Sequence, residues 1–269
     1  MTTTVRSYCL RLLQSGDLAT KLAPPRAPDG SRLDDSEPGP AVHIEAPARD
    51  PALQLHKGAG RLPPLSALGD PAARVAVLAR FAHHELMATE LFAWALLQWP
   101  ELPASLRRGF LQALEEEQIH LGLYLDRLAA HGAQLGDEPL SDYFWQHVPA
   151  MAAGGPQAFL AAMGLTLEQA NLDFTLLYRD AFRTAGDEET AQVLQRVHDD
   201  EIGHVRLAAV WLRRLAGSKD EVEAYAAAVP FPLSAARAKA RRFDVKARRR
   251  AGLTDAFIEW VRAARPYEK

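Results

Sequence analysis

Leu114-Glu115-Glu116-Glu117-Gln118-Ile119-His120 is the stretch that decides the fold. Its core, Glu117-x-x-His120, returns 84 residues later as Glu201-x-x-His204. Residues three apart lie on one face of a helix, so each glutamate and histidine can reach a common point. A carboxylate and an imidazole that converge in this way form half of a metal site. One such pair also occurs by chance in many helices, so the residues before each copy decide its meaning.

A further glutamate precedes both copies at nearly the same distance. Glu85 lies 32 residues before Glu117, and Glu168 lies 33 residues before Glu201. The midpoint of each interval falls in a segment with the Pro or Gly residues that end helices. If each segment folds as an antiparallel helical hairpin, its two glutamates lie at the same height. This agreement is independent of the motif itself, and it strengthens the prediction of two metal-binding hairpins.

The sequence therefore predicts an all-α protein in which the two hairpins form a four-helix bundle, with no substantial sheet. A connection of about 24 residues follows the second helix and is long enough to cross over along the bundle. Alignment of the two hairpins also places Glu90 on Asp173 and Glu116 on Asp200. The four helices are expected at about 70–98, 103–131, 155–185 and 187–215.

Three parts are expected along the chain. Residues 1–69 should contain a short helix over residues 4–22, followed by a Pro- and Gly-rich arm that lies over the core or is partly disordered. Residues 70–216 should form the bundle, and residues 217–269 a helical, partly basic extension that ends in a helix at about 254–264. Within the extension, residues 237–250 are strongly basic; we interpret them as a solvated helix face, with contact to RNA or another polyanion as the alternative.

Composition indicates an ordinary globular protein. The 269 residues are 48% hydrophobic and 24% charged, and the net charge of -3 gives no general reason to expect a nucleic-acid partner. Cys9 is the only cysteine, which is consistent with a reducing compartment. We see neither a leader peptide nor an apolar run of about 18 residues, so we expect a cytoplasmic protein without a membrane segment.

The chemistry follows from bringing four glutamates and two histidines into one bundle. Four buried carboxylates must either take up protons or hold cations, and two divalent ions would balance their charge. Hard oxygen ligands with one imidazole per ion suit iron or manganese. The plain alternative is a set of solvated glutamates with incidental histidines. His83 and His84 flank Glu85 but face away from it, so we expect neither to be a ligand. The expected metal ligands are Glu85, Glu117, His120, Glu168, Glu201 and His204.

Five further residues are candidates for supporting roles around the metals. Glu116 and Asp200 each precede a ligand glutamate, and each is expected to accept a hydrogen bond from a ligand histidine, with a solvent-facing salt bridge as the alternative. Asn171 and Thr175 share the face of Glu168, where they could line a reaction cavity or simply be polar core residues. Tyr124 lies one turn beyond His120 on the same face.

The pattern Glu, Glu-x-x-His, Glu, Glu-x-x-His resembles the ferritin-like di-iron carboxylate proteins over residues 70–216. Within that superfamily, three segments are most similar to an uncharacterised bacterial branch described as a domain of unknown function. They are His84-Glu85-Leu86-x-Ala88-x-Glu90, Gly136-Asp137 and Asp200-Glu201-Ile202-Gly203-His204-Val205 with Trp211. The resemblance implies that Glu85, Glu117 and His120 hold one metal and Glu168, Glu201 and His204 the other, with Glu117 and Glu201 as bridging carboxylates.

The same resemblance implies an oxidoreductase that contains two metal ions, iron by first expectation and manganese or a mixed Mn/Fe pair as the alternatives. It would use dioxygen or peroxide and an electron donor to oxidise or hydroxylate a small organic substrate, none of which the sequence names. Two other functions stay open: a ferroxidase-like protein that handles iron or peroxide without an organic substrate, and a helical interaction protein with a structural metal site. The chain is also compatible with an oligomer.

Overall fold

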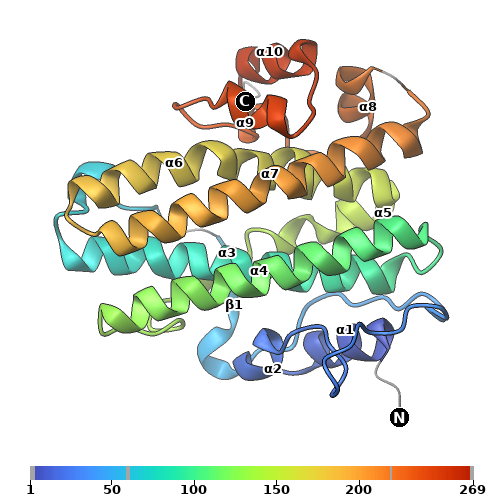
Figure 1. Ribbon diagram of the computed structural model, residues 1–269, viewed down its shortest axis with the longest axis horizontal. Helices are drawn as coiled ribbons and strands as arrows, with labels where there is room; N and C mark the ends of the chain where they lie inside the picture. The colour runs from blue at the N-terminus through green and yellow to red at the C-terminus, as the bar shows by residue number, and fades with distance from the viewer. Residues whose placement is uncertain (1–3, 59–60, 219, 267–269) are drawn as a thin grey trace. The chain divides into compact units, whose positions relative to one another are not determined.

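The computed structural model describes residues 4–58, 61–218 and 220–266, which are mostly α-helical (Figure 1). The all-α class expected from the sequence is therefore confirmed. The chain divides into two compact units, Met1–Val148 and Pro149–Lys269. Each unit contains one of the two helical hairpins that the ligand spacing predicts.

The hairpin of the first unit consists of α3 (Pro71–Gln98) and α4 (Ala104–Ala130), which pack along each other (Figure 1). The α3 helix begins where the Asp70 side chain accepts a hydrogen bond from the Ala72 amide, with a proline at the first helical position. The predicted helices at 70–98 and 103–131 are thus confirmed to within a residue at each end.

The N-terminal segment of the first unit contains two helices, α1 (Val5–Gln14) and α2 (Leu18–Leu22), so the single helix expected over residues 4–22 is wrong. The chain turns at Gly16, where a Cβ atom would lie 2.4 Å from the Asp50 carboxylate. Asp17 then starts α2 by accepting hydrogen bonds from the Ala19 and Thr20 amides.

The Pro- and Gly-rich arm runs against the first hairpin. Arg107 of α4 pairs with Asp35 through two hydrogen bonds of 2.6 and 2.8 Å, and the Val42 amide donates to the Leu97 carbonyl at 3.0 Å. The strands β1 (Leu55–His56) and β2 (Leu140–Ser141) pair in parallel and join the arm to the segment after α4. The arm is expected either to lie over the core or to be partly disordered. Its described residues lie over the core. Single 3-10 turns occur at Pro51–Leu53, Leu65–Ala67 and Trp145–His147.

The second hairpin consists of a long composite helix and α7 (Glu188–Ala216). The composite helix comprises α5 (Val148–Phe159), the π-helical segment η4 (Leu160–Glu168) and α6 (Gln169–Thr184). Within α5 the backbone is non-helical at Gly155, with φ of 73°. The uninterrupted part of the composite helix therefore begins just after Gly155, next to the predicted start at residue 155. The predicted helices at 155–185 and 187–215 are confirmed in extent.

The third predicted helix is not α-helical throughout, because the segment that ends at Glu168 is π-helical. In a π-helix such as η4, the backbone hydrogen bonds join residues five apart, whereas in an α-helix they join residues four apart. The Thr166 hydroxyl donates to the Ala161 carbonyl five residues earlier at 2.7 Å and also lies 2.7 Å from the Tyr225 hydroxyl. Gly164 faces α7 so closely that a Cβ atom there would lie 2.1 Å from the Cβ of Ala208.

The C-terminal extension packs on the second hairpin. It contains α8 (Glu221–Ala228), α9 (Val245–Arg250) and α10 (Asp255–Ala263), which confirms the helix expected at 254–264. The basic run 237–250 is not only a solvated face, because Arg248 is fully buried against Asp173. Burial of one arginine in this run corrects the simple interpretation from composition.

One helical stretch among the described residues, Trp145–Thr184, is long and apolar enough to cross a membrane. The sequence expectation of no such stretch overlooked it because glycine, glutamate and glutamine interrupt its apolar residues. Of its apolar window, 56% is buried inside the structure, and the core helix of a soluble protein has this same property.

Candidate metal centre

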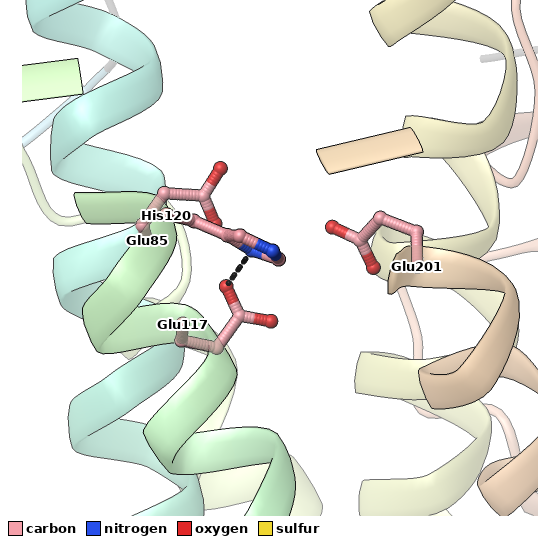
Figure 2. A group of neighbouring side chains, drawn as sticks. All are labelled: Glu85, Glu117, His120 and Glu201. Atoms are coloured by element: carbon pink, nitrogen blue, oxygen red, sulfur yellow. Dashed lines mark ion pairs between the residues drawn. The ribbon is translucent and has the colours of Figure 1, made fainter. Parts of the chain in front are cut away.

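Glu85, Glu117 and His120 converge within the first unit. Glu85 comes from α3, and the other two come from α4, where a spacing of three places them on one face. All three side chains are buried, and each offers a ligand atom within 4.8 Å of the others. The His120 Nδ1 atom lies 3.5 Å from Glu117 Oε2, and Figure 2 shows the side chains pointing toward one another. The antiparallel hairpin thus brings together the three residues predicted for one metal.

Glu168, Glu201 and His204 converge in the same way within the second unit. Glu168 is the last residue of η4, and Glu201, which Figure 2 also labels, shares a face of α7 with His204. These side chains are buried, and their ligand atoms also lie within 4.8 Å of one another. The His204 Nδ1 atom lies 3.2 Å from Glu201 Oε2 and 3.9 Å from Glu168 Oε2.

Each triplet therefore combines two carboxylates and one imidazole in a buried position. Two negative charges with no compensating cation are costly in such surroundings, whereas a divalent ion would neutralise them. Carboxylate oxygens and imidazole nitrogens are also the ligand types that iron and manganese accept. These buried glutamate and histidine groups could hold a metal ion.

Asn171 and Thr175, which are predicted to support the second triplet, make different hydrogen bonds. Asn171 donates its side-chain amide to Glu201 Oε1 at 2.9 Å, so it directly contacts a predicted ligand. The Thr175 hydroxyl donates to the Asn171 backbone carbonyl, which directs this hydroxyl to the helix itself. Tyr124 lies on α4, one turn beyond His120. It is buried, and its ring centre lies 5.7 Å from that of Phe81.

Glu116 and Asp200 are half-buried and make contacts within their own helices. Glu116 accepts a hydrogen bond from Gln112 at 2.9 Å, and Asp200 accepts one from Arg196 at 2.5 Å. Their expected hydrogen bonds to ligand histidines stay a prediction.

His83 and His84 lie outside the two ligand groups found among the described residues. Burial lowers the pKa of His83 to about 2 and that of His84 to about 3, so both imidazoles are neutral near pH 7. The ring of His84 stacks on Phe144, with 5.0 Å between the ring centres. His84 is thus half-buried against an aromatic ring, and His83 is buried.

A buried charge cluster beside the first hairpin was missed by sequence reasoning. Glu90 of α3 is fully buried and receives two hydrogen bonds from Arg49, at 2.8 and 2.7 Å. Lys21 Nζ lies 2.9 Å from Glu90 Oε1, and the Trp145 indole N–H donates to Oε2 at 3.0 Å. We call these four residues the Glu90 cluster.

An equivalent cluster lies beside the second hairpin. Asp173 of α6 is fully buried and receives two hydrogen bonds from Arg248, at 2.7 and 3.0 Å. The backbone amides of Ala240 and Asp244 also donate to it, at 3.0 and 2.7 Å. We call these residues the Asp173 cluster. The alignment of Glu90 with Asp173 was the one signal in the sequence that could have revealed both.

Comparison with known families gives one match. The model of a family described as a protein of unknown function, DUF455, matches residues 11–259, which include both hairpins and most of both terminal extensions. No curated protein and no solved structure is significantly similar to the chain.

Proposed function

We propose that this chain, which belongs to the DUF455 family, is a di-metal oxidoreductase with a ferritin-like four-helix bundle. In this proposal α3, α4, the composite helix and α7 form the bundle, and the two triplets share one centre. One observation carries the proposal: two buried Glu, Glu, His triplets of the same composition, each built by one hairpin.

Charge supports two ions rather than one. The two triplets together contain four carboxylates, and two divalent cations bring an equal and opposite charge. Iron is the metal we propose, with manganese or a mixed pair as the alternatives, because the donor set is mainly carboxylate oxygen with one imidazole per ion. Glu117 and Glu201 would be the bridging ligands between the two ions.

Such a pair of ions, if bound by the six residues, would supply redox equivalents and open positions for dioxygen or peroxide. The protein contributes the ligand geometry and a site that excludes water, since all six ligand side chains are at least 96% buried. The hydrogen bond from Asn171 holds the Glu201 carboxylate in place. An organic substrate would be oxidised or hydroxylated, with electrons from a separate donor.

Metal content and thermal unfolding test the site. The variants are Glu117→Ala and Glu201→Ala, one in each triplet, each measured with and without iron(II) or manganese(II). We expect the wild type to bind two ions per chain and to unfold at a higher temperature with metal, and each variant to lose binding. Without metal, we expect the variants to be at least as stable as the wild type, because a buried charge has been removed.

Glu115→Ala is the matched control for these variants. Glu115 belongs to the same run of glutamates but forms a partly exposed ion pair with Arg26, so its loss should change stability by no more than about 1 kcal/mol and leave metal binding intact. A wild type that binds less than one ion and gains no stability from metal would contradict the di-metal proposal.

Oxygen consumption separates the oxidoreductase from a ferroxidase-like protein. If oxygen consumption stops once the added iron(II) has been oxidised, and resumes only when iron(II) is provided again, the protein is ferroxidase-like. If the loaded protein, with two ions and a reductant, consumes oxygen repeatedly, it is an oxidase. This second outcome is the one we expect.

A further inference from the structure

We infer that Asn171 is a positioning residue that fixes the orientation of the Glu201 carboxylate for metal binding. This inference rests on the proposed function. It deepens that proposal by assigning unequal support to the two triplets.

The direction of the hydrogen bond is set by chemistry. An ionised carboxylate only accepts hydrogen bonds, so the atom of Asn171 that lies 2.9 Å from Glu201 Oε1 must be the amide nitrogen. The other carboxylate oxygen, Oε2, lies 3.2 Å from His204 Nδ1. Each oxygen of Glu201 therefore has its own polar neighbour, and the plane of the carboxylate is defined without a metal.

Asn171 is itself well placed to act as a support. It lies on α6, three residues after Glu168. The ligand Glu168 and the residue that supports Glu201 therefore share one helix face. The Thr175 hydroxyl donates to the Asn171 carbonyl, which ties this turn of the helix. A donor on a helix varies little in position, which is what a second layer of hydrogen bonds around a metal requires.

The first hairpin differs at the position equivalent to Asn171. The residue three positions after Glu85 is Ala88, whose side chain cannot donate a hydrogen bond to Glu117. The two triplets therefore have the same composition but differ in the support available at this position. We expect the ion held by Glu168, Glu201 and His204 to depend on Asn171, and the other ion to depend on it less.

Loss of a hydrogen bond to a metal ligand typically costs about 10- to 100-fold in metal affinity. The test is calorimetric titration of the full chain with manganese(II) and, separately, cobalt(II), for the wild type, Asn171→Leu and Asn171→Gln. Leucine keeps the approximate volume of asparagine without a donor, whereas glutamine keeps an amide. We expect Asn171→Leu to lower the affinity for one of the two ions about 10- to 100-fold, and Asn171→Gln to lie closer to the wild type.

Infrared spectroscopy supplies a readout that a merely structural role would not move. In the metal-loaded chain, the carboxylate stretching bands of the wild type should shift in Asn171→Leu, because one oxygen has lost its donor. Gln195→Leu is the matched control: its half-buried amide donates to Asp199, a carboxylate outside both triplets, at 3.2 Å. We expect the control to leave the affinity unchanged, and also to leave unchanged those carboxylate bands that move when metal is added, because Asp199 lies outside both triplets.

Three outcomes overturn the inference. Asn171→Leu could bind both ions within about twofold of the wild-type affinity with unchanged bands, or Gln195→Leu could lose as much affinity as Asn171→Leu. In both cases the proposed function would stand, because the wild type still binds two ions. A wild type that binds no metal would instead contradict the proposed function, and the inference with it.

Discussion

The two hairpins place a buried carboxylate at the same position but neutralise it differently. Glu90 and Asp173 each follow the first ligand of their hairpin by five residues, and both are fully buried. Glu90 is surrounded by two cations and an indole N–H, whereas Asp173 has one arginine and two backbone amides. The repeated helices thus provide the acids, and segments outside the repeat provide the partners.

This difference teaches that the terminal segments are part of the fold. Arg49 belongs to the N-terminal arm and Arg248 to the C-terminal extension, and neither segment resembles the other in sequence. A buried carboxylate that loses its cation is left with an uncompensated charge, which destabilises a protein strongly. The extensions therefore stabilise the helices that carry Glu85 and Glu168.

The largest expected effect comes from breaking the Asp173 cluster. Arg248 makes the only ion pair of Asp173 among the described residues, so Arg248→Met should lower the free energy of unfolding by about 3–5 kcal/mol. Arg49→Met should cost less, about 1.5–3 kcal/mol, because Lys21 remains beside Glu90. Urea unfolding of both variants measures the difference.

The double variant Asp173→Leu with Arg248→Met is the control for that comparison. Replacing both charges with apolar side chains removes the buried charge as well as its partner, so much of the lost stability should return. Equal losses for Arg49→Met and Arg248→Met would show that the second cation of the Glu90 cluster has no influence.

A smaller effect is expected from the indole donor of the Glu90 cluster. Trp145→Phe removes the N–H that donates to Glu90 Oε2 but keeps an aromatic ring, and a hydrogen bond to a charged group contributes about 1.5–3 kcal/mol. Stability should fall by that amount in urea unfolding. Trp99→Phe, another buried tryptophan of the first unit, corrects for the loss of ring size; a loss no larger than that of this control would contradict the role of the N–H.

The π-helical segment is the other difference between the hairpins, and its test has a smaller expected effect. Thr166→Val removes the hydroxyl that bonds to Ala161 and Tyr225, and should cost about 1 kcal/mol. Tyr225→Phe and the double variant complete a cycle that measures the coupling between the two hydroxyls. Additive losses in the double variant would mean that the contact contributes nothing to stability.

The last test concerns the reactivity of Cys9 and does not measure the free energy of unfolding. This thiol is buried on α1, and burial raises its pKa, so the reactive thiolate is suppressed in the folded protein. At pH 8 an alkylating reagent should modify Cys9 at the rate at which the N-terminal helices open. If Arg49 also fastens the arm, Arg49→Met should speed the modification and Arg248→Met should leave it unchanged. Equal rates of Cys9 modification in the two variants would show that the Glu90 cluster does not hold α1 in place.

Much of the fold and of the candidate site could be predicted from the sequence. The distance from Glu85 to Glu117 and the turn at its midpoint sufficed for the first hairpin, because helical geometry is regular and short turns have strong signals. The ligand triplets followed from the same spacing. These predictions needed only local rules.

The parts that could not be predicted depend on contacts between distant segments. Nothing local indicates that Arg49, rather than a neighbouring cation, reaches Glu90, since the pairing is set by how an irregular arm packs. The π-helical segment before Glu168 likewise depends on Tyr225 and on the close approach of Gly164 to Ala208. In both cases the structure is determined by packing between distant segments and not by local helix propensity.

The order in which the two clusters can form follows from the direction of protein synthesis. When Glu90 leaves the ribosome, both of its cationic partners, Lys21 and Arg49, have already been made, and Trp145 follows 55 residues later. Asp173 must wait for Arg248, which is 75 residues later. At about 5–20 residues per second this delay lasts roughly 4–15 s. Until Arg248 has been made, Asp173 lacks its cationic partner, whereas both cations of Glu90 precede it in the chain.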